Sequence, residues 1–389
     1  MVILSQVQIN IVLFVLLLIL LVHMYFNMNR KNITNRLFMW VMGLTAVILM
    51  LEMFSVILNN PNLKQFIVLH KMINVIGFTV SPIIPFLGYV FSKEWANRYQ
   101  KEKIKFKKIL LLPLFINAIM ALISYSGNVL FHVTSENIYE RGPLFFILPC
   151  ISYMYFGYNL YFIYKERKKF TWYEFRIFNL FYIVAAIFTG IQLIYSGYLT
   201  TWNGTALMVV IIYIFILNDQ AHRDRLTGLE NYSSYENYIE NVSNKKINNL
   251  FIINIDIDDF KKVNDKFGHH EGDEAIKIFA NLLIESFPLR KKKLIRLGGD
   301  EFLILLEDEQ QETVEDYIQN LTENVEAYNR TGEKLYRLKF SYGMACYANA
   351  NESIHELLKC ADQFMYEQKQ SRKSESLSSI ASNSKINFH

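Results

Sequence analysis

The sequence predicts an all-α polytopic membrane domain of about seven transmembrane helices, followed by a water-soluble α/β (α+β) domain. One observation behind this expectation is a hydrophobic content of 52% over 389 residues, which is high for a soluble protein. Another is the charge distribution: residues 1–217 carry 18 Lys or Arg, 7 Glu and no Asp, whereas the rest carries 22 basic and 29 acidic residues. Beyond Gly228, long apolar runs also give way to short alternating units. Because the charge is divided in this way, the net charge of +4 is no sign of nucleic-acid binding, and we expect no such partner.

Seven apolar stretches are long enough, or nearly so, to cross about 30 Å of hydrocarbon as helices. Their expected limits are 8–26, 37–58, 72–92, 108–126, 144–164, 175–197 and 204–218. The first has no basic residue before it and no small-residue cleavage site, so we expect it to remain as a span. Residues 1–218 are therefore predicted to form a seven-span membrane sensor domain.

The loops between these spans predict the orientation, because Lys and Arg near span ends are retained in the cytoplasm. The first, third and fifth loops are basic, and the alternate loops carry only Lys64, Lys71 and Arg141. We therefore expect a multi-pass protein of the cell membrane with its N-terminus outside and its C-terminal domain in the cytoplasm. The basic residues of the three cytoplasmic loops are Arg30, Lys31, Arg36, Lys93, Arg98, Lys101, Lys103, Lys105, Lys107, Lys108, Lys165, Arg167, Lys168, Lys169 and Arg176.

Within the membrane half, polar residues and prolines mark the third span. His70 and Lys71 lie at its outer edge, and Pro82 and Pro85 lie within it. They are compatible with a ligand pocket, but equally with snorkelling side chains and a tolerated kink.

The seventh span runs without Pro or Gly into the soluble part, which predicts a linker helix over 219–226. Residues 250–255 are typical of a buried strand, 273–287 of a helix, and 293–297 with 302–306 of a hairpin. Further along, 310–328 predicts a helix, 336–347 a strand or strand pair, and 353–370 an amphipathic helix. The serine-rich tail at 374–389 has no periodic apolar face, so we expect it to be disordered.

Two runs of the soluble part carry residues suited to nucleotide chemistry. RLGGDEF at 296–302 lies between two short strands, so it forms a hairpin tip; taken alone, it is equally well an ordinary tight turn. NIDIDDFKKVND at 254–265 places an acid at the end of a buried strand, followed by Lys and Asn. Asp256 and Asp300 are the candidate metal ligands, because Mg²⁺ prefers one or two protein carboxylates together with phosphate oxygens. Gly298 and Gly299 would let the main chain approach a nucleotide closely.

With three further motifs, the chain resembles the diguanylate cyclase, or GGDEF, family of bacterial signal-transduction enzymes over residues 224–373. The five motifs occur in the family's order. They are DRLTGLEN at 224–231, the DxDxFKxxND run at 256–265, GHHEGD at 268–273, GGDEF at 298–302 and ADQFMYEQK at 361–369. Two positions depart from the family pattern, namely Tyr232 after the opening motif and Ser371 after the closing one.

The resemblance implies a role for each matching residue. Asp256, the main-chain carbonyl of Ile257 and Asp300 match the metal positions, for two Mg²⁺ (or Mn²⁺) per active site, and Asp300 and Glu301 match the catalytic acid pair. The remaining matches are to positions that bind the substrate GTP. Lys261 and Lys369 match positions that bind the triphosphate, and Asn264 and Asp273 match positions that hydrogen-bond guanine. His269, Gly298 and Gly299 match residues of the substrate loops.

The resemblance also implies an activity and an assembly. Two GGDEF domains, each holding one GTP, must face each other to form cyclic di-GMP, so a homodimer is expected. The membrane domain would control that encounter through the linker. An alternative is a catalytically silent GGDEF receptor that binds GTP or a protein partner. Such a receptor would be expected to have lost an acid, either at Asp256 or in the GGDEF motif at 298–302, and none is lost. A cyclase making a mixed GMP and AMP dinucleotide would be favoured by a changed residue at position 273, which is Asp.

Overall fold

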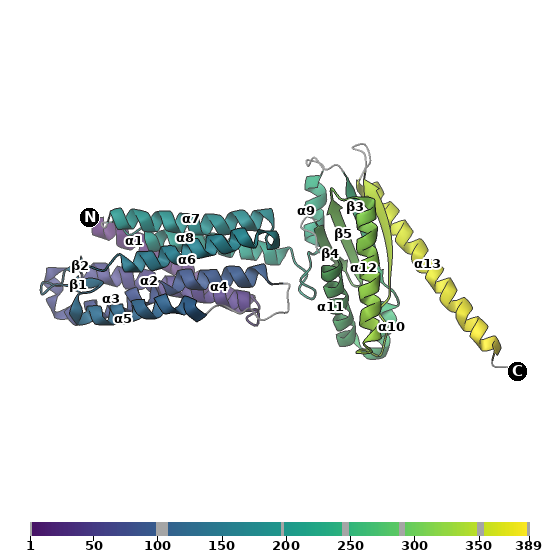
Figure 1. Ribbon diagram of the computed structural model, residues 1–389, viewed down its shortest axis with the longest axis horizontal. Coiled ribbons are helices and arrows are strands. Elements are labelled where there is room, and N and C mark those ends of the chain that lie inside the picture. The colour runs from purple at the N-terminus through teal and green to yellow at the C-terminus, as the bar shows by residue number, and fades with distance from the viewer. Residues whose placement is uncertain are drawn as a thin grey trace. The chain divides into compact units, whose positions relative to one another are not determined.

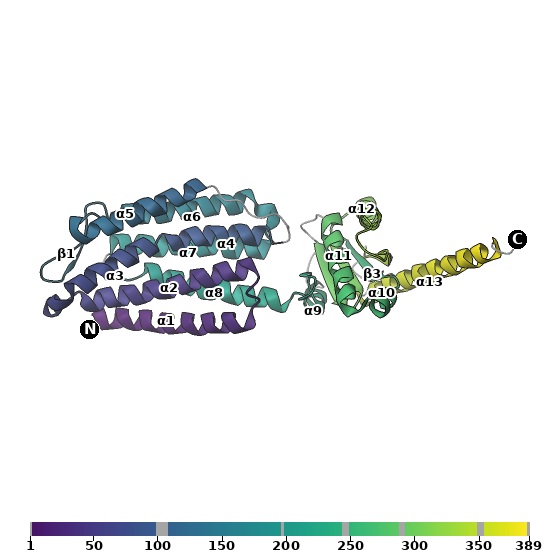
Figure 2. The ribbon, with the colours of Figure 1, turned by 90° about the horizontal axis from the view of Figure 1, so that it is seen from below.

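The computed structural model describes residues 2–98, 108–195, 198–242, 249–287, 292–347 and 354–386, and its ribbon is drawn in Figures 1 and 2. It divides into two compact units, Met1–Ile216 and Leu217–His389. The predicted fold class is confirmed, since a helical unit precedes an α/β unit.

The first unit is a bundle of long helices that lie side by side (Figures 1 and 2). A two-stranded antiparallel hairpin is inserted between two of the helices. The elements are α1 (Val2–Asn27), α2 (Ile33–Leu58), η1 (Pro61–Phe66), α3 (Ile67–Val80), α4 (Ile83–Ala96), η2 (Lys108–Leu111), α5 (Leu112–Gly127), β1 (Phe131–Val133), β2 (Tyr139–Arg141), α6 (Ile147–Lys165), η3 (Arg167–Lys169), α7 (Trp172–Ile194) and α8 (Thr201–Ala221).

In the part of the chain that the structure describes, six helices are long and apolar enough to cross a membrane, so the predicted count of seven is approximate. The expected span at 144–164 coincides with α6, which is not among the six. Its composition explains the difference, because five of its nineteen residues are tyrosine. The expected span at 72–92 is divided into α3 and α4 at Pro82, which has no N–H to continue the hydrogen bonds of the first helix.

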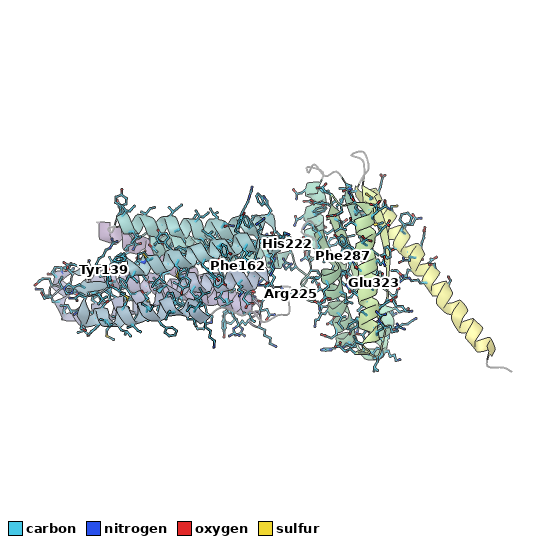
Figure 3. All side chains as sticks on the ribbon, viewed as in Figure 1. Tyr139, Phe162, His222, Arg225, Phe287 and Glu323 are labelled. Carbon is cyan, nitrogen blue, oxygen red and sulfur yellow. The ribbon has the colours of Figure 1, made fainter. Side chains whose placement is uncertain are left out.

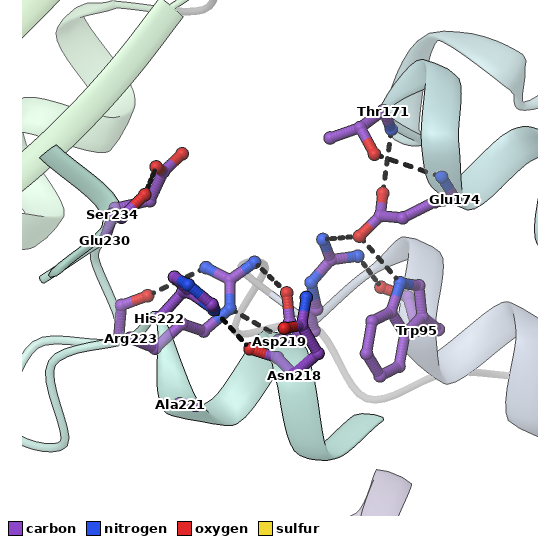
Figure 4. A network of polar contacts seen from close by, with 12 residues as sticks. Trp95, Thr171, Glu174, Asn218, Asp219, Ala221, His222, Arg223, Glu230 and Ser234 are labelled. Carbon is purple, nitrogen blue, oxygen red and sulfur yellow. Dashed lines mark hydrogen bonds and ion pairs between the residues drawn. The ribbon is translucent and has the colours of Figure 1, made fainter. Parts of the chain in front are cut away.

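Aromatic packing fills the interior of the bundle where α4, α7 and α8 meet. The rings of Phe91 and Phe178 stack with centroids 5.7 Å apart, and the ring centroids of Trp95 and Phe215 are 5.2 Å apart. At the start of α7, Glu174 completes a capping box with Thr171 and accepts hydrogen bonds from Trp95 and Arg98, the first at 3.0 Å (Figure 4). Large apolar side chains remain exposed along α1, α5 and α7, as expected for surfaces that face lipid.

The helix that leads toward the second unit ends earlier than the sequence predicted. α8 stops at Ala221, whereas a linker helix was expected over 219–226. Arg223 pairs with Asp219 at 2.7 Å and its backbone bridges to Glu230, so the chain turns back on itself (Figure 4). Hydrogen bonds that close this turn compete with further helix formation and end the helix.

The second unit is built on a four-stranded sheet of order β4-β5-β3-β6, in which all neighbours are antiparallel. The strands are β3 (Leu250–Ile257), β4 (Lys292–Gly298), β5 (Glu301–Glu307) and β6 (Phe340–Tyr347). β4 and β5 form the predicted hairpin, and the predicted strand or strand pair at 336–347 is the single strand β6. β3 lies in the middle, so its apolar side chains are buried on both faces.

Helices cover both faces of the sheet. On one face Phe251, Ile253 and Ile255 pack with α11 (His269–Ser286) and α12 (Gln311–Arg330), and Phe287 lies 5.8 Å from the Tyr317 ring (Figure 3). On the other face the alternate β3 residues pack with α9 (Tyr232–Val242) and α13 (Ile354–Ile386). A short helix, α10 (Phe260–Phe267), follows β3.

The tail also differs from expectation. α13 continues to Ile386, although residues 374–389 were predicted to be disordered. No Gly or Pro follows residue 353, and these are the residues that most strongly disfavour a helix. The sequence therefore contains no strong signal that would end α13 earlier.

Candidate active site

The candidate residues meet where β3 ends beside the β4–β5 turn. Asp256 on β3 is opposite Glu301 on β5 and Ser341 on β6. The backbone N–H of Ile257 donates to the carbonyl of Asp300 at 3.2 Å, which ties the turn to the end of β3. The antiparallel register therefore brings together two motifs that are more than forty positions apart in the sequence.

Asp256 is 7% exposed, and its carboxylate lies 2.5 Å from the Lys369 ammonium on α13. Burial raises the pKa of Asp256, and the charges of Asp300 and Asp258 act in the same direction against the opposing effect of Lys369. For Lys369, burial alone would lower the pKa, but the hydrogen bond to Asp256 and the surrounding acids raise it above its usual value. Lys369 thus partly neutralises a buried acid that other acids surround.

Glu301, the first residue of β5, has an exposed side chain. Burial of part of its carboxyl group raises its pKa, and the nearby charges of Asp256, Asp300 and Asp362 raise it further. These pKa shifts indicate that the carboxylates of Asp256, Asp300 and Glu301 lie close enough for their negative charges to repel one another. Such a site attracts cations and gives Glu301 more proton affinity than an isolated glutamate has.

The oxygen ligands at this place suit the metal that the sequence suggests only in part. Among the residues that the structure describes, no group of three or more His, Cys, Asp or Glu could hold a metal ion. Mg²⁺ nevertheless often takes one or two protein carboxylates and completes its shell with phosphate oxygens and water. Asp256 and Asp300, which the hydrogen bond from the Ile257 N–H to the Asp300 carbonyl brings together, therefore fit a metal that arrives with a nucleotide.

The hairpin turn leaves space above its backbone. Gly299 has φ of +52°, a conformation that glycine adopts without strain. Gly298 has no such φ, and a Cβ placed on either glycine would meet no protein atom within 4 Å. The protein itself therefore gives no steric reason for glycine at position 298, and the space beside this residue is open.

A second group of predicted residues lies on α10 and α11. A Cβ on Gly272 would overlap the side-chain oxygen of Asn264, so glycine at 272 allows Asn264 to lie directly against α11. Asp273 is the next residue, and its side chain is exposed. Lys261 and His269 are also exposed, on the first turns of α10 and α11. The packing of α10 against α11 thus brings Asn264 and the segment that carries Asp273 together.

Sequence reasoning gave no role to Arg296, which the structure shows in a bridging position. Its guanidinium donates to both carboxylate oxygens of Asp224, at 3.0 and 3.2 Å, and to the carbonyl of Gly299 at 2.8 Å. Arg296 therefore joins the opening motif to the turn that presents Asp300. The sequence feature that could have pointed to this role is a single basic residue two positions before the glycine pair.

Asp258 was also not singled out. Its carboxylate accepts a hydrogen bond from Ser341 at 2.7 Å and lies 3.4 Å from the guanidinium of Arg372. Arg372 donates as well to the carbonyl of Phe340. The cation that follows the closing motif is therefore held against the sheet beside the candidate site.

Comparisons with known proteins place the similarity in the second unit. Residues 221–375 match the family model described as diguanylate cyclase, GGDEF domain. The chain is 31% identical over 176 residues to the probable diguanylate cyclase DgcT of Escherichia coli (strain K12), covering 43% of this chain and 38% of DgcT. It is 29% identical over 156 residues to the cyclic di-GMP phosphodiesterase NbdA of Pseudomonas aeruginosa, covering 39% of this chain and 20% of NbdA. The chain thus spans less than two fifths of the length of either relative.

A solved structure is also similar. It is the coiled coil and GGDEF domain of DgcB from Caulobacter crescentus in complex with c-di-GMP, at 23% identity and a TM-score of 0.38. The match covers 42% of this chain and 87% of that chain.

Proposed function

We propose that this chain, which carries a GGDEF domain at residues 221–375, is a membrane-bound diguanylate cyclase that condenses two GTP into cyclic di-GMP and two pyrophosphate. The observation that carries the proposal is the meeting of Asp256, Asp300 and Glu301 at the end of β3, with Lys369 against them. Every acid that the chemistry needs is present. The names of relatives such as DgcT support the same activity.

The proposed reaction is the attack of a ribose 3′-hydroxyl on an α-phosphate. Glu301, with its raised pKa, accepts the hydroxyl proton together with Asp300, because a carboxylate of higher pKa is the stronger base. Lys369 and Lys261 bind the triphosphate, and the open backbone at Gly298 and Gly299 lets it approach. Two Mg²⁺ or Mn²⁺ ions, held by Asp256, the Ile257 carbonyl and Asp300, would supply neutralisation of phosphate charge when bound.

The proposed base pocket uses Asn264 and Asp273. A carboxylate accepts hydrogen bonds from guanine N1 and the exocyclic amino group, and adenine lacks this pair of donors. Asn264, held against Gly272, supplies the amide that completes the recognition. His269 lies at the start of the same helix and borders the substrate loop.

The full reaction requires two such domains, so we infer a homodimer in which each copy contributes one GTP. The membrane unit would bias the encounter between the two domains, because α8 leads directly to the opening motif. We also infer that α6 crosses the membrane as a seventh span, with the N-terminus outside and the GGDEF domain in the cytoplasm, where GTP is available, following the basic loops.

The test is to incubate the purified full chain with GTP and Mg²⁺ and to identify the product by mass spectrometry. Cyclic di-GMP is the expected product. GTP binding without any turnover, in the presence of an intact dimer, would instead favour a silent receptor.

A further inference from the structure

A cavity of about 670 Å³ lies inside the helical bundle of the membrane unit. Its walls come from α2, α3, α4, α6, α7, α8 and the β hairpin. This volume is within the range of small-molecule sites, which measure roughly 300–1,000 Å³. Most of the lining is apolar, and Phe78, Phe156, Phe181 and Trp202 are among the aromatic residues that contribute to it.

One acid faces this cavity. Glu52 on α2 accepts a hydrogen bond from the Asn10 amide at 3.1 Å and another from the Gln192 amide at 3.4 Å. It lies six residues before the end of α2 at Leu58, which is about 9 Å along the helix axis. Among the residues that the structure describes, no Lys, Arg or His forms an ion pair with it. Acids within a membrane span are costly and mark functional sites, and a cation is the group that would stabilise this one.

The orientation of Gln192 is fixed by the chain around it. Its side-chain oxygen accepts from the backbone N–H groups of Thr200 and Thr201, at 2.9 and 2.8 Å, just where α8 begins. The amide nitrogen is therefore left to point to Glu52. Arg141, which also lines the cavity, donates to the backbone carbonyls of Leu193 and Gln192. Its guanidinium is thus engaged with main-chain oxygens rather than with Glu52.

A polar network holds the wall between α2 and α3. Ser55 donates to Asn74 at 3.2 Å and contacts His70 at 3.3 Å, and both Ser55 and Asn74 line the cavity. The other ring nitrogen of His70 lies 3.0 Å from Asn137, whose amide also donates to the carbonyl of Leu58. Asn137 belongs to the turn of the hairpin that carries Tyr139, another lining residue (Figure 3). The cavity therefore has one preformed polar wall, and the hairpin contributes Tyr139 to its lining.

We propose that this cavity is a binding site for a small organic amine, with its ammonium group paired to Glu52 and its apolar, preferably aromatic, body against the phenylalanine and tryptophan side chains. A negatively charged ligand would be repelled by Glu52, and a neutral one would leave the acid without a counter-ion. The aromatic faces also favour a cation through their quadrupoles. The site is independent of the proposed cyclase activity.

The test measures binding to the purified full chain in detergent micelles, without GTP, by isothermal titration calorimetry. Three probes of similar shape and different charge are compared: tryptamine, the neutral tryptophol and the anionic indole-3-propionate. The amine is expected to bind at least about tenfold more tightly than the other two. Equal affinities for the three probes, or no binding of tryptamine at millimolar concentration, would overturn the proposal.

Two variants act on the site in different ways. Glu52→Gln removes the charge with little change in shape and should abolish the preference for the amine. Gly77→Leu should block all three probes, because Gly77 lines the cavity and a Cβ there meets no atom within 4 Å. The added side chain therefore enters the cavity without a clash at the backbone.

Matched controls separate these effects from damage to the fold. Gly157→Leu adds the same side chain to α6 at an exposed glycine that also has free space and does not line the cavity. Glu136→Gln removes an exposed acid that pairs with Lys64 on the surface. Both controls should bind tryptamine as the wild type does. Unchanged tryptamine binding in both Glu52→Gln and Gly77→Leu would show that the probe binds elsewhere.

Discussion

One guanidinium nitrogen of Arg296, Nη1, donates to both carboxylate oxygens of Asp224, 72 positions away in the sequence, at 3.0 and 3.2 Å. Burial alone would raise the pKa of Asp224, but hydrogen bonds from Thr227 and Arg296 outweigh it and hold the pKa below its ordinary value of 3.8. A lowered carboxyl pKa means that this pairing stabilises the folded unit above about pH 4 and is lost on further acidification. Because Arg296 also donates to the carbonyl of Gly299, the pair connects the opening motif with the hairpin turn.

Arg296→Lys should therefore slow cyclisation more than it weakens the fold. A lysine cannot reach Asp224 and Gly299 together, so the turn that carries Asp300 would lose its anchor. We expect kcat to fall about tenfold or more, with little change in the KM for GTP. Arg330→Lys, at an exposed residue near the end of α12, is the matched control. Equal kinetics in the two variants would mean that the bridge does not position the turn.

Two glycine variants should separate function from stability. Gly298→Ala meets no protein atom within 4 Å, so the free energy of unfolding should change by less than about 1 kcal/mol while turnover of GTP falls sharply. Gly343→Ala would overlap the carbonyl oxygen of Ala361 on α13, so it should destabilise the domain by about 3 kcal/mol or more. Thermal unfolding and initial rates measured on both variants check this contrast. Near wild-type activity in Gly298→Ala would remove the argument that this glycine serves the nucleotide.

GTP should be strongly preferred over ATP. If Asn264 and Asp273 recognise guanine, adenine leaves their polar groups unpaired, which costs several kcal/mol in discrimination. Gly272→Ala should raise the KM for GTP, because the added Cβ displaces Asn264. Rates with the two nucleotides as competing substrates give the ratio directly, and similar rates would place base recognition elsewhere.

The orientation in the membrane is open to reporter fusions. A reporter that is active only outside the membrane should work when joined after Thr200 and fail when joined after Lys107, because the basic third loop is retained in the cytoplasm. The opposite pattern would exclude the proposed topology.

Local patterns predicted the elements around the candidate site well. The apolar run that became β3 and the Gly-Gly hairpin were readable because strand and turn signals depend on neighbouring residues. The family match over 221–375 confirms the resemblance that five motifs in order had indicated. By contrast, two short helices, α9 and α10, were not predicted, since eight to eleven residues give only a brief amphipathic pattern.

Contacts between distant residues could not be read from the sequence. The contact between the Lys369 ammonium and Asp256, 113 positions away, was not predicted. This contact depends on how α13 packs across the sheet, which no local pattern encodes. The early end of α8 has a similar origin, because it follows from the bridge between Arg223 and Glu230. The roles of the site residues remain predictions for the same reason.

The measurement that tests the central claim most directly is cyclic di-GMP formation by the full chain and by its Asp256→Asn and Asp300→Asn variants. Each substitution removes a formal charge from the proposed metal site with almost no change in volume. It should therefore raise the activation free energy of cyclisation by several kcal/mol, which lowers the turnover rate strongly. For Asp256→Asn, the stability without Mg²⁺ should be maintained, because burial already disfavours the charged form of this group. The account predicts product from the wild type and almost none from either variant, with normal unfolding curves. Near wild-type production of cyclic di-GMP by both variants would contradict it.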